Sequence, residues 1–256
     1  MRGLAGKVAV VVGGAGGIGT ATCTRLSEEG CAVAVGDLDS AAAQEVADRI
    51  KANGGHALAQ ETDIGDELQV GALIDRTVGE LGGLDILHAN AAAMSADTIG
   101  SDSNVVEMPL ESFDGSIRAG ARGHLLCARH AIPRLLERGG GALIFTSSGS
   151  AFAGEPKRPA YAMSKSAINA LVRHIASRWG KEGIRANAVA PGLVRTERTF
   201  EVLADEDTLN SVLSTLRSPR VGTPDDIAAM VAFLASADGE WINGQVIAVD
   251  GGTTLR

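Results

Sequence analysis

Short apolar runs alternate with segments of helical periodicity along the whole of this 256-residue sequence. The first run, 8–12, contains only valine and alanine, a composition typical of a strand buried on both faces of a sheet. The predicted strands are 8–12, 32–35, 56–60, 84–88, 142–146, 185–189 and 245–249. The predicted helices cover about 18–29, 40–52, 66–81, 111–137, 160–180 and 224–236.

This alternation predicts a doubly wound α/β fold: one parallel sheet of about seven strands with helices on both faces, in a single domain over 1–256. A closed eight-stranded barrel is the alternative, but the count of seven strands and the phosphate-type first turn favour the open sheet. The longest stretch without a predicted strand, 193–222, is expected to form a lid over the ligand crevice. The alternative for that stretch is an ordinary pair of surface helices.

Composition excludes several classes of partner. A net charge of −8 and an aromatic content of 3% argue against nucleic acid. No run approaches the ~18 apolar residues of a membrane helix, so no membrane association is expected. The three cysteines lack C-x-x-C spacing and the five histidines lack metal-ligand spacing. We therefore expect free thiols in the cytoplasm and no metal.

A glycine-rich turn, Gly13-Gly14-Ala15-Gly16-Gly17-Ile18-Gly19, follows the first strand and opens directly into a helix. Glycines let backbone amides approach a pyrophosphate, and the helix N-terminus supplies partial positive charge. Asp37 follows the second strand at about the spacing of a ribose-binding carboxylate. Such a carboxylate repels a 2′-phosphate, so the pattern favours NAD over NADP. The alternative for Asp37 is a turn residue or a helix cap.

The only tyrosine, Tyr161, precedes Lys165 by four residues at the start of a predicted helix. At this spacing the phenol and the ammonium group share one helix face. A cation about 5 Å away in an effective dielectric near 20 is worth roughly 3 kcal/mol, or about two units of the tyrosine pKa. Desolvation of the phenolate opposes this effect, so the cation must outweigh it if Tyr161 is to exchange protons.

With these residues in order, the sequence resembles the short-chain dehydrogenase/reductase family from about Lys7 to Gly252. The turn matches the family's T-G-x-x-x-G-x-G-like cofactor motif, and Tyr161 and Lys165 match its Y-x-x-x-K. Ser148 matches its catalytic serine. The pair Asp63-Ile64 resembles its adenine-contacting pair, and the segment 191–196 resembles its nicotinamide-contacting P-G-x-V-x-T.

The resemblance implies reversible hydride transfer between NAD and a secondary alcohol or ketone, in a homotetramer. Tyr161 is expected to exchange the proton, Ser148 to position the substrate oxygen, and Lys165 to lower the tyrosine pKa. The expected cofactor-binding residues are Gly13, Gly17, Ile18, Gly19, Asp37, Leu38, Asp63, Ile64, Asn90, Ala91, Tyr161, Lys165, Pro191, Gly192, Val194 and Thr196.

Three positions depart from the family pattern. Val12 stands where a threonine usually braces the turn, and the N-N-A-G segment retains one asparagine, Asn90. Gly120 stands where the catalytic relay asparagine is expected. We hypothesise that Ser116, His124 or an extra water replaces it; the alternative is that both side chains face solvent.

Gly120 keeps other function classes open. One is a cofactor-binding sensor or assembly subunit with a degraded site. Another is epimerisation on the same fold, because fold does not fix function. The intact Ser148, Tyr161 and Lys165 favour the oxidoreductase.

The expected substrate pocket is lined by Met94, Ser95, Ser150, Phe152, Leu193 and the segment 196–203. Most of these residues are small or apolar, which predicts a neutral, moderately hydrophobic substrate. Glu155 and Arg158 are candidates for binding a polar substituent, with a solvated loop as the alternative. The connection 93–108 is several residues longer than is usual in the family.

Overall fold

The computed structural model describes residues 1–255, except the side chain at position 202, so the last residue of the predicted domain lies outside it. Seven parallel strands form one sheet in the order β3-β2-β1-β4-β5-β6-β7. The strands are β1 (Val8–Val12), β2 (Ala32–Asp37), β3 (Ala57–Glu61), β4 (Ile86–Ala89), β5 (Gly141–Thr146), β6 (Ile184–Pro191) and β7 (Val246–Val249). The predicted doubly wound fold is confirmed.

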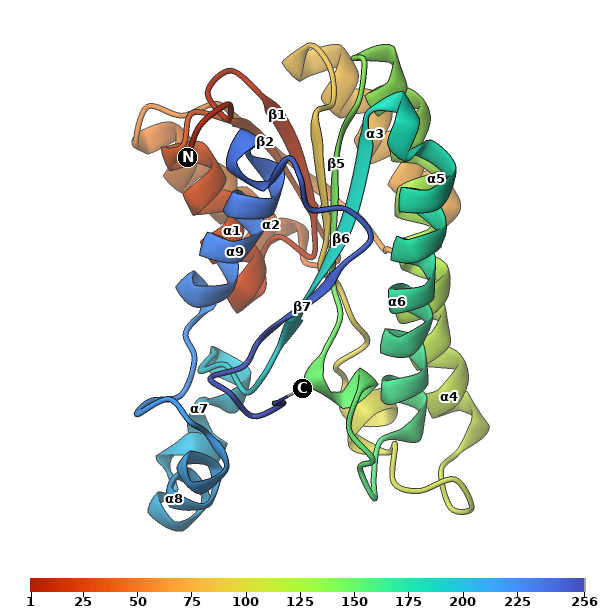
Figure 1. Ribbon diagram of the computed structural model, residues 1–256, viewed down its shortest axis with the longest axis vertical. Helices are drawn as coiled ribbons and strands as arrows, with labels where there is room; N and C mark the ends of the chain where they lie inside the picture. The colour runs from red at the N-terminus through yellow and green to blue at the C-terminus, as the bar shows by residue number, and fades with distance from the viewer. Residues whose placement is uncertain (256) are drawn as a thin grey trace.

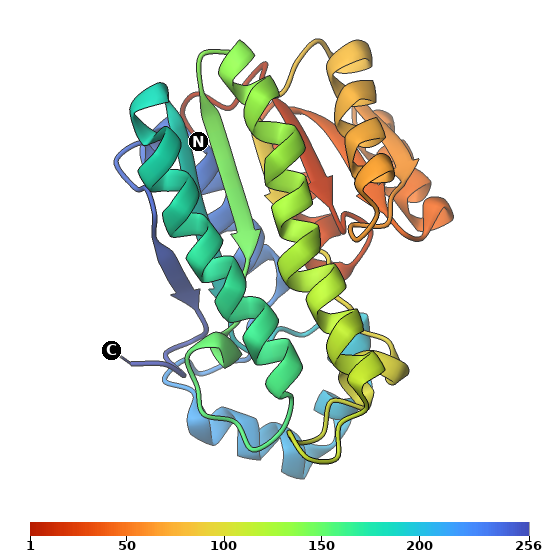
Figure 2. The ribbon, with the colours of Figure 1, turned by 90° about the vertical axis from the view of Figure 1, so that its right-hand side faces the viewer.

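Helices cover both faces of the sheet (Figure 1). One face carries α1 (Gly17–Glu28), α2 (Ser40–Ala52) and α9 (Pro224–Ala235). The other face carries α3 (Glu67–Leu81), α4 (Leu110–Ile117), α5 (Gly123–Glu137) and α6 (Pro159–Trp179), and α5 and α6 face the viewer in Figure 2.

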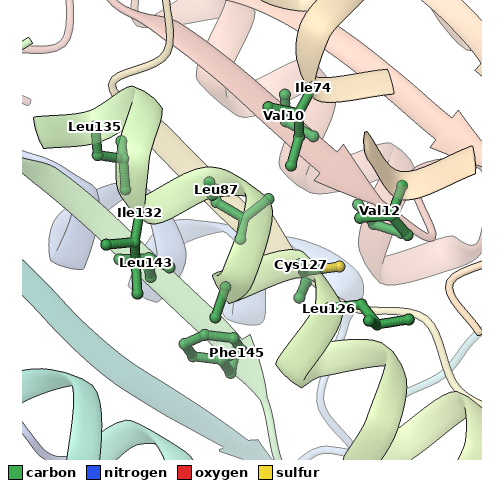
Figure 3. Close-up of a cluster of buried hydrophobic side chains, with 14 of the residues drawn as sticks. Val10, Val12, Ile74, Leu87, Leu126, Cys127, Ile132, Leu135, Leu143 and Phe145 are labelled. Carbon is green, nitrogen blue, oxygen red and sulfur yellow. The ribbon is translucent and has the colours of Figure 1, made fainter. Parts of the chain in front are cut away.

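The apolar residues form one core on each face of the sheet. Along β1, Val10 and Val12 pack toward α3 and α5, whereas Ala9 and Val11 pack toward α1 and α9. This alternation follows from the two-residue period of a strand. Figure 3 shows the first core, in which Phe145 and other strand side chains lie against helix residues such as Leu126.

The predicted helix over 111–137 is interrupted. It consists of α4, a π-helical turn over Arg118–Arg122, and α5. The ends of the predicted strands lie within two residues of the observed ends, and those of β1 coincide with them. Among the described helices none is long and apolar enough to cross a membrane.

The stretch 193–222 forms two short helices, α7 (Glu197–Ala204) and α8 (Glu206–Thr215), which project from the body of the molecule (Figure 1). They pack around a small cluster of their own, formed by Leu203, Leu216 and Val221.

Candidate active site

The strand order reverses between β1 and β4, so the loops at their carboxyl ends diverge to opposite sides of the sheet. The glycine-rich turn follows β1, and Asn90 follows β4. Gly13 has a φ of 81°, and a Cβ there would lie 2.6 Å from the Ala91 nitrogen, so only glycine fits. Asn90 Nδ2 donates to the Gly13 carbonyl at 2.9 Å. Asn90 therefore braces the turn from the neighbouring loop, although Val12 offers no hydroxyl.

The backbone after Gly13 suits an anionic ligand. The N-cap of α1, Gly16, makes no side-chain capping bond, and the first turn of α1 carries no acidic residue. A Cβ on Gly16 would have open space around it, whereas a Cβ on Gly19 would lie 1.9 Å from the Gly13 carbonyl oxygen. These residues fit the pyrophosphate of a dinucleotide.

Asp37 lies beside the glycine-rich turn. Its carboxylate accepts hydrogen bonds from the Ala15 amide at 2.9 Å and the Asp39 amide at 3.2 Å. A carboxylate has about four acceptor sites, so these two bonds leave capacity for ribose hydroxyls. The neighbouring Leu38 side chain is 69% exposed.

Asp63 is held by a cation that sequence reasoning did not identify. Arg118 donates to both carboxylate oxygens, at 3.1 and 2.8 Å, and the Gly65 amide donates at 2.8 Å. Burial raises the pKa of Asp63, but these bonds outweigh it and hold the pKa below its ordinary value. The side chain of Ile64 is buried in the core.

The three predicted catalytic residues come together at the end of β5 and the start of α6. Ser148 follows β5, and its hydroxyl lies close enough to the side chain of Tyr161 to lower the pKa of the phenol. Lys165 Nζ lies 5.6 Å from the centroid of the Tyr161 ring and donates to the Thr146 carbonyl at 2.8 Å. The arrangement can hold a substrate oxygen between a hydroxyl and a phenol.

Burial dominates the electrostatics of this pair. Lys165 is 1% exposed, and burial lowers its pKa to about 8. Burial also raises the pKa of Tyr161, more than the Ser148 hydrogen bond and the Arg158 charge lower it. Lys165 is expected from the sequence to lower the pKa of Tyr161. With the protein's own residues the pKa of Tyr161 is raised instead, because desolvation is the larger effect.

Gly120 faces α6 at very close range. A Cβ at Gly120 would lie 2.6 Å from the Ser164 Cβ, so an asparagine there would require α6 to move. The two hypothetical substitutes, Ser116 and His124, are both buried, and the alternative that they face solvent is wrong.

His124 is held in one orientation. Its Nδ1 lies 2.8 Å from the Gly120 carbonyl oxygen, while burial and the charge of Lys165 lower its pKa to about 3. The neutral ring therefore donates from Nδ1 and keeps a free lone pair on Nε2. This Nε2 and Ser116 Oγ have no hydrogen-bond partner among the described atoms.

A buried polar chain behind the site was missed by sequence reasoning. Thr146 Oγ1 donates to Asn90 Oδ1 at 2.9 Å, so His88 Nε2, also at 2.9 Å, must donate to Thr146 Oγ1. Because Asn90 braces Gly13 and Lys165 Nζ donates to the Thr146 carbonyl, the chain links the glycine-rich turn to Lys165. The only sequence signal is a histidine and a threonine at the ends of apolar strands.

The segment after β6 reaches the glycine-rich turn. Strand β6 ends at Pro191. The Gly192 amide donates a hydrogen bond to the Val249 carbonyl, and Val194 is buried. A Cβ on Gly17 would lie 2.9 Å from Thr196 Cγ2, so Thr196 closely abuts the turn.

Helix α7 also contacts the loop after β4. Thr196 caps α7, and Arg198 Nη1 on that helix donates to the Met94 carbonyl at 2.9 Å. The helix is therefore tied to both sides of the site.

Polar groups near the serine are paired with one another. Ser150 Oγ donates to Glu155 at 2.6 Å, and Arg158 donates to the other Glu155 oxygen at 2.9 Å. The Ser150 amide donates to Ser148 Oγ at 3.1 Å. Residues 1–255 contain no cluster of side chains suited to a metal ion.

The sequence model described as enoyl-(acyl carrier protein) reductase matches residues 13–254. A probable short-chain type dehydrogenase/reductase of Bradyrhizobium diazoefficiens is 43% identical over 96% of this chain and 87% of its own length. Versicolorin reductase of Emericella nidulans is 39% identical over 97% of this chain and 96% of its own length. A solved 7α-hydroxysteroid dehydrogenase, complexed with NADH and 7-oxo glycochenodeoxycholic acid, is 30% identical with a TM-score of 0.91, over 100% of this chain and 97% of that one.

Proposed function

The chain belongs to the short-chain dehydrogenase/reductase family of oxidoreductases, and on that premise we propose that it interconverts a secondary alcohol and a ketone with NAD(H). The observation that carries the proposal is the convergence of Ser148, Tyr161 and Lys165 at a place that the hydrogen bonds of Thr146 and Asn90 link to the glycine-rich turn. The substrate is proposed to be a neutral, moderately hydrophobic small molecule, because residues predicted to line the pocket, such as Met94 and Leu193, are apolar.

NAD is the proposed cofactor because Asp37 lies next to the turn that fits the pyrophosphate. Its carboxylate would hydrogen-bond the ribose hydroxyls and repel a 2′-phosphate. Gly13, Gly17 and Gly19 would hold the pyrophosphate, and Lys165 the nicotinamide ribose. When bound, the cofactor supplies or accepts the hydride.

The protein's own residues handle the proton. In ketone reduction, Ser148 donates a hydrogen bond to the substrate oxygen, and the Tyr161 phenol gives its proton to that oxygen as charge develops. The raised pKa of Tyr161 keeps the phenol protonated at neutral pH, which is the form that reduction requires. In alcohol oxidation the proton returns to the tyrosine oxygen.

The relay behind Lys165 is proposed to use His124 and Ser116 in place of an asparagine side chain. Each buries a polar atom that has no hydrogen-bond partner among the described atoms, and His124 also feels the charge of Lys165. A buried water at either atom would supply the missing hydrogen-bond partner.

A panel of alcohols and ketones with NADH and NADPH, read by nicotinamide absorbance, tests the proposal. Tyr161→Phe should lower kcat by about 10²- to 10⁴-fold, because it removes the general acid–base. It should leave NADH binding nearly unchanged, as measured by fluorescence titration. A Tyr161→Phe enzyme with wild-type turnover would overturn the assignment.

Gly120 is the one observation that favours the alternative, a cofactor-binding sensor or assembly subunit. The same panel separates the two functions, because the sensor binds NADH measurably and turns over nothing.

We also propose a homotetramer that works in the cytoplasm. Exposed apolar side chains on α4, α5 and α6, namely Leu110, Leu125 and Met163, offer a surface for self-association. All three cysteines are buried free thiols, as suits a reducing compartment. Light scattering should give four times the chain mass of 26.1 kDa.

A further inference from the structure

The catalytic helix α6 begins without a cap of its own. Its N-cap residue, Arg158, has the left-handed φ of 64° and makes no side-chain capping bond. The next residue is Pro159, which has no amide hydrogen to offer. The amides of Ala160 and Tyr161 therefore need an acceptor from elsewhere in the chain.

Asp102 supplies that acceptor from the long connection after β4. Its Oδ1 accepts from the Ala160 amide at 3.2 Å, and its Oδ2 accepts from the Tyr161 amide at 2.8 Å. The backbone is joined as well, because the Arg158 amide donates to the Asp102 carbonyl at 3.0 Å and to the Ser103 carbonyl at 3.2 Å.

The Asp102 carboxylate is committed to this contact. The residue is 2% exposed, and it belongs to none of the ion pairs among the described residues. A buried carboxylate without a cation requires other stabilisation, and here two amide donors and the positive end of a 21-residue helix provide it.

We infer that Asp102 is a positioning residue for the proposed reaction: its carboxylate fixes the backbone of Tyr161, and hence the phenol, against Ser148. This inference rests on the proposed function and gives the long connection 93–108 a role. Adjacent parts of that connection are anchored too, since Met94 accepts from Arg198 and Ser112 Oγ donates to the Asp97 carbonyl.

Two variants of Asp102 test the inference. Asp102→Ala removes both amide contacts, and Asp102→Asn keeps one accepting oxygen. We expect kcat to fall by about 10- to 100-fold in Asp102→Ala and by less in Asp102→Asn, because small misplacement of an acid–base group is costly. The dissociation constant for NADH should stay within about threefold, since the glycine-rich turn is untouched.

A second measurement does not depend on turnover. Tyr161 is the only tyrosine, so an ultraviolet titration of the protein reports this phenol alone. In the wild type burial raises the pKa of Tyr161. Loosening its backbone should shift the titration of Asp102→Ala down, toward the ordinary value of about 10.

Asp66→Ala is the matched control. Asp66 also accepts from two helix amides, those of Leu68 and Gln69, but it caps its own helix α3, which carries no predicted catalytic residue. This variant should lose comparable thermal stability and keep its kcat within about twofold.

Two results would overturn the role of Asp102. One is a folded Asp102 variant with wild-type kcat and an unshifted tyrosine titration. The other is an equal loss of kcat in Asp66→Ala. If the wild type turns over no alcohol or ketone, the proposed function fails instead, and the titration still tests Asp102.

Discussion

Ser116 and His124 each bury one polar atom without a partner among the described atoms, and the charge of the buried Lys165 acts on His124. An unpaired buried polar atom is costly unless a water or a proton-transfer role accounts for it. Replacing both residues by alanine should lower kcat by about 10- to 100-fold and leave the substrate KM within about twofold, as measured by steady-state kinetics.

His174→Ala is the control for this experiment. His174 packs edge-on against Trp179 toward the far end of α6, away from the predicted catalytic residues. Unchanged turnover in the Ser116/His124 double variant would remove the substitute relay.

Asp37 is the residue whose charge should choose the cofactor. Asp37→Ser removes the charge beside the glycine-rich turn but keeps a hydroxyl that can accept from the Ala15 amide. We expect kcat/KM for NADH to fall about tenfold or more, because hydrogen bonds to a charged acceptor are worth roughly 1.5–3 kcal/mol. Activity with NADPH should rise. A variant that keeps the wild-type preference would exclude Asp37 as the selector.

Among the elements, α7 is proposed to act as a lid, because its Arg198 spans the site to the Met94 carbonyl. Arg198→Ala should raise the dissociation rate of NADH several-fold and leave the thermal midpoint within about 2 °C, since an exposed bond adds little stability. Stopped-flow fluorescence measures the rate. Arg195→Ala is the control on the same segment. The Arg195 amide donates a hydrogen bond to the Gly222 carbonyl, which the substitution keeps, and no described contact joins the Arg195 side chain to Met94. An unchanged rate in Arg198→Ala would count against the lid.

Sequence patterns predict these elements unevenly. The valine-rich run of β1 is buried on both sides, so its position follows from composition alone. The orientation of His124 cannot be predicted in this way. The π-helical turn over Arg118–Arg122 shifts the helical phase between α4 and α5. A regular helical period carried across that turn therefore places later side chains on the wrong face.

Residues that act through tertiary contacts are equally hidden from the sequence. Arg118 pairs with Asp63 across 55 positions, and Asp102 reaches Tyr161 across 59. Tyr161, Lys165 and the glycine-rich turn were predictable because their spacing is local and their chemistry is specific. The pKa direction of Tyr161 was not, because burial depends on the packing of the whole site.

At the scale of the whole molecule, two buried histidines should govern stability in acid. Burial lowers the pKa of His88 and of His124 to about 3. Between pH 3 and the unfolded value of about 6.5, unfolding takes up a proton at each histidine. The free energy of unfolding should therefore fall as the pH drops below about 6.5, by roughly 1.4 kcal/mol per pH unit for each histidine.

Urea denaturation between pH 5 and 6.5 measures this slope, in a range where most carboxylates stay ionised. His124→Gln should lower the slope by about half, whereas His56→Gln should leave it unchanged, because His56 is exposed. A slope of zero in the wild type would mean that the histidines take up protons in the folded protein just as they do in the unfolded chain.

Cys23 lies directly beneath the glycine-rich turn: it is fully buried, its thiol hydrogen-bonds the Gly14 carbonyl, and burial raises its pKa. An alkylating reagent can reach this sulfur only when the turn opens. The labelling rate of Cys23 therefore reports how often the turn opens. A dinucleotide bound to the turn should slow the labelling of Cys23 and leave that of Cys127, a buried residue of α5, much less affected. The labelling rate of Cys23 should therefore report whether the cofactor is bound, in an assay that requires no substrate.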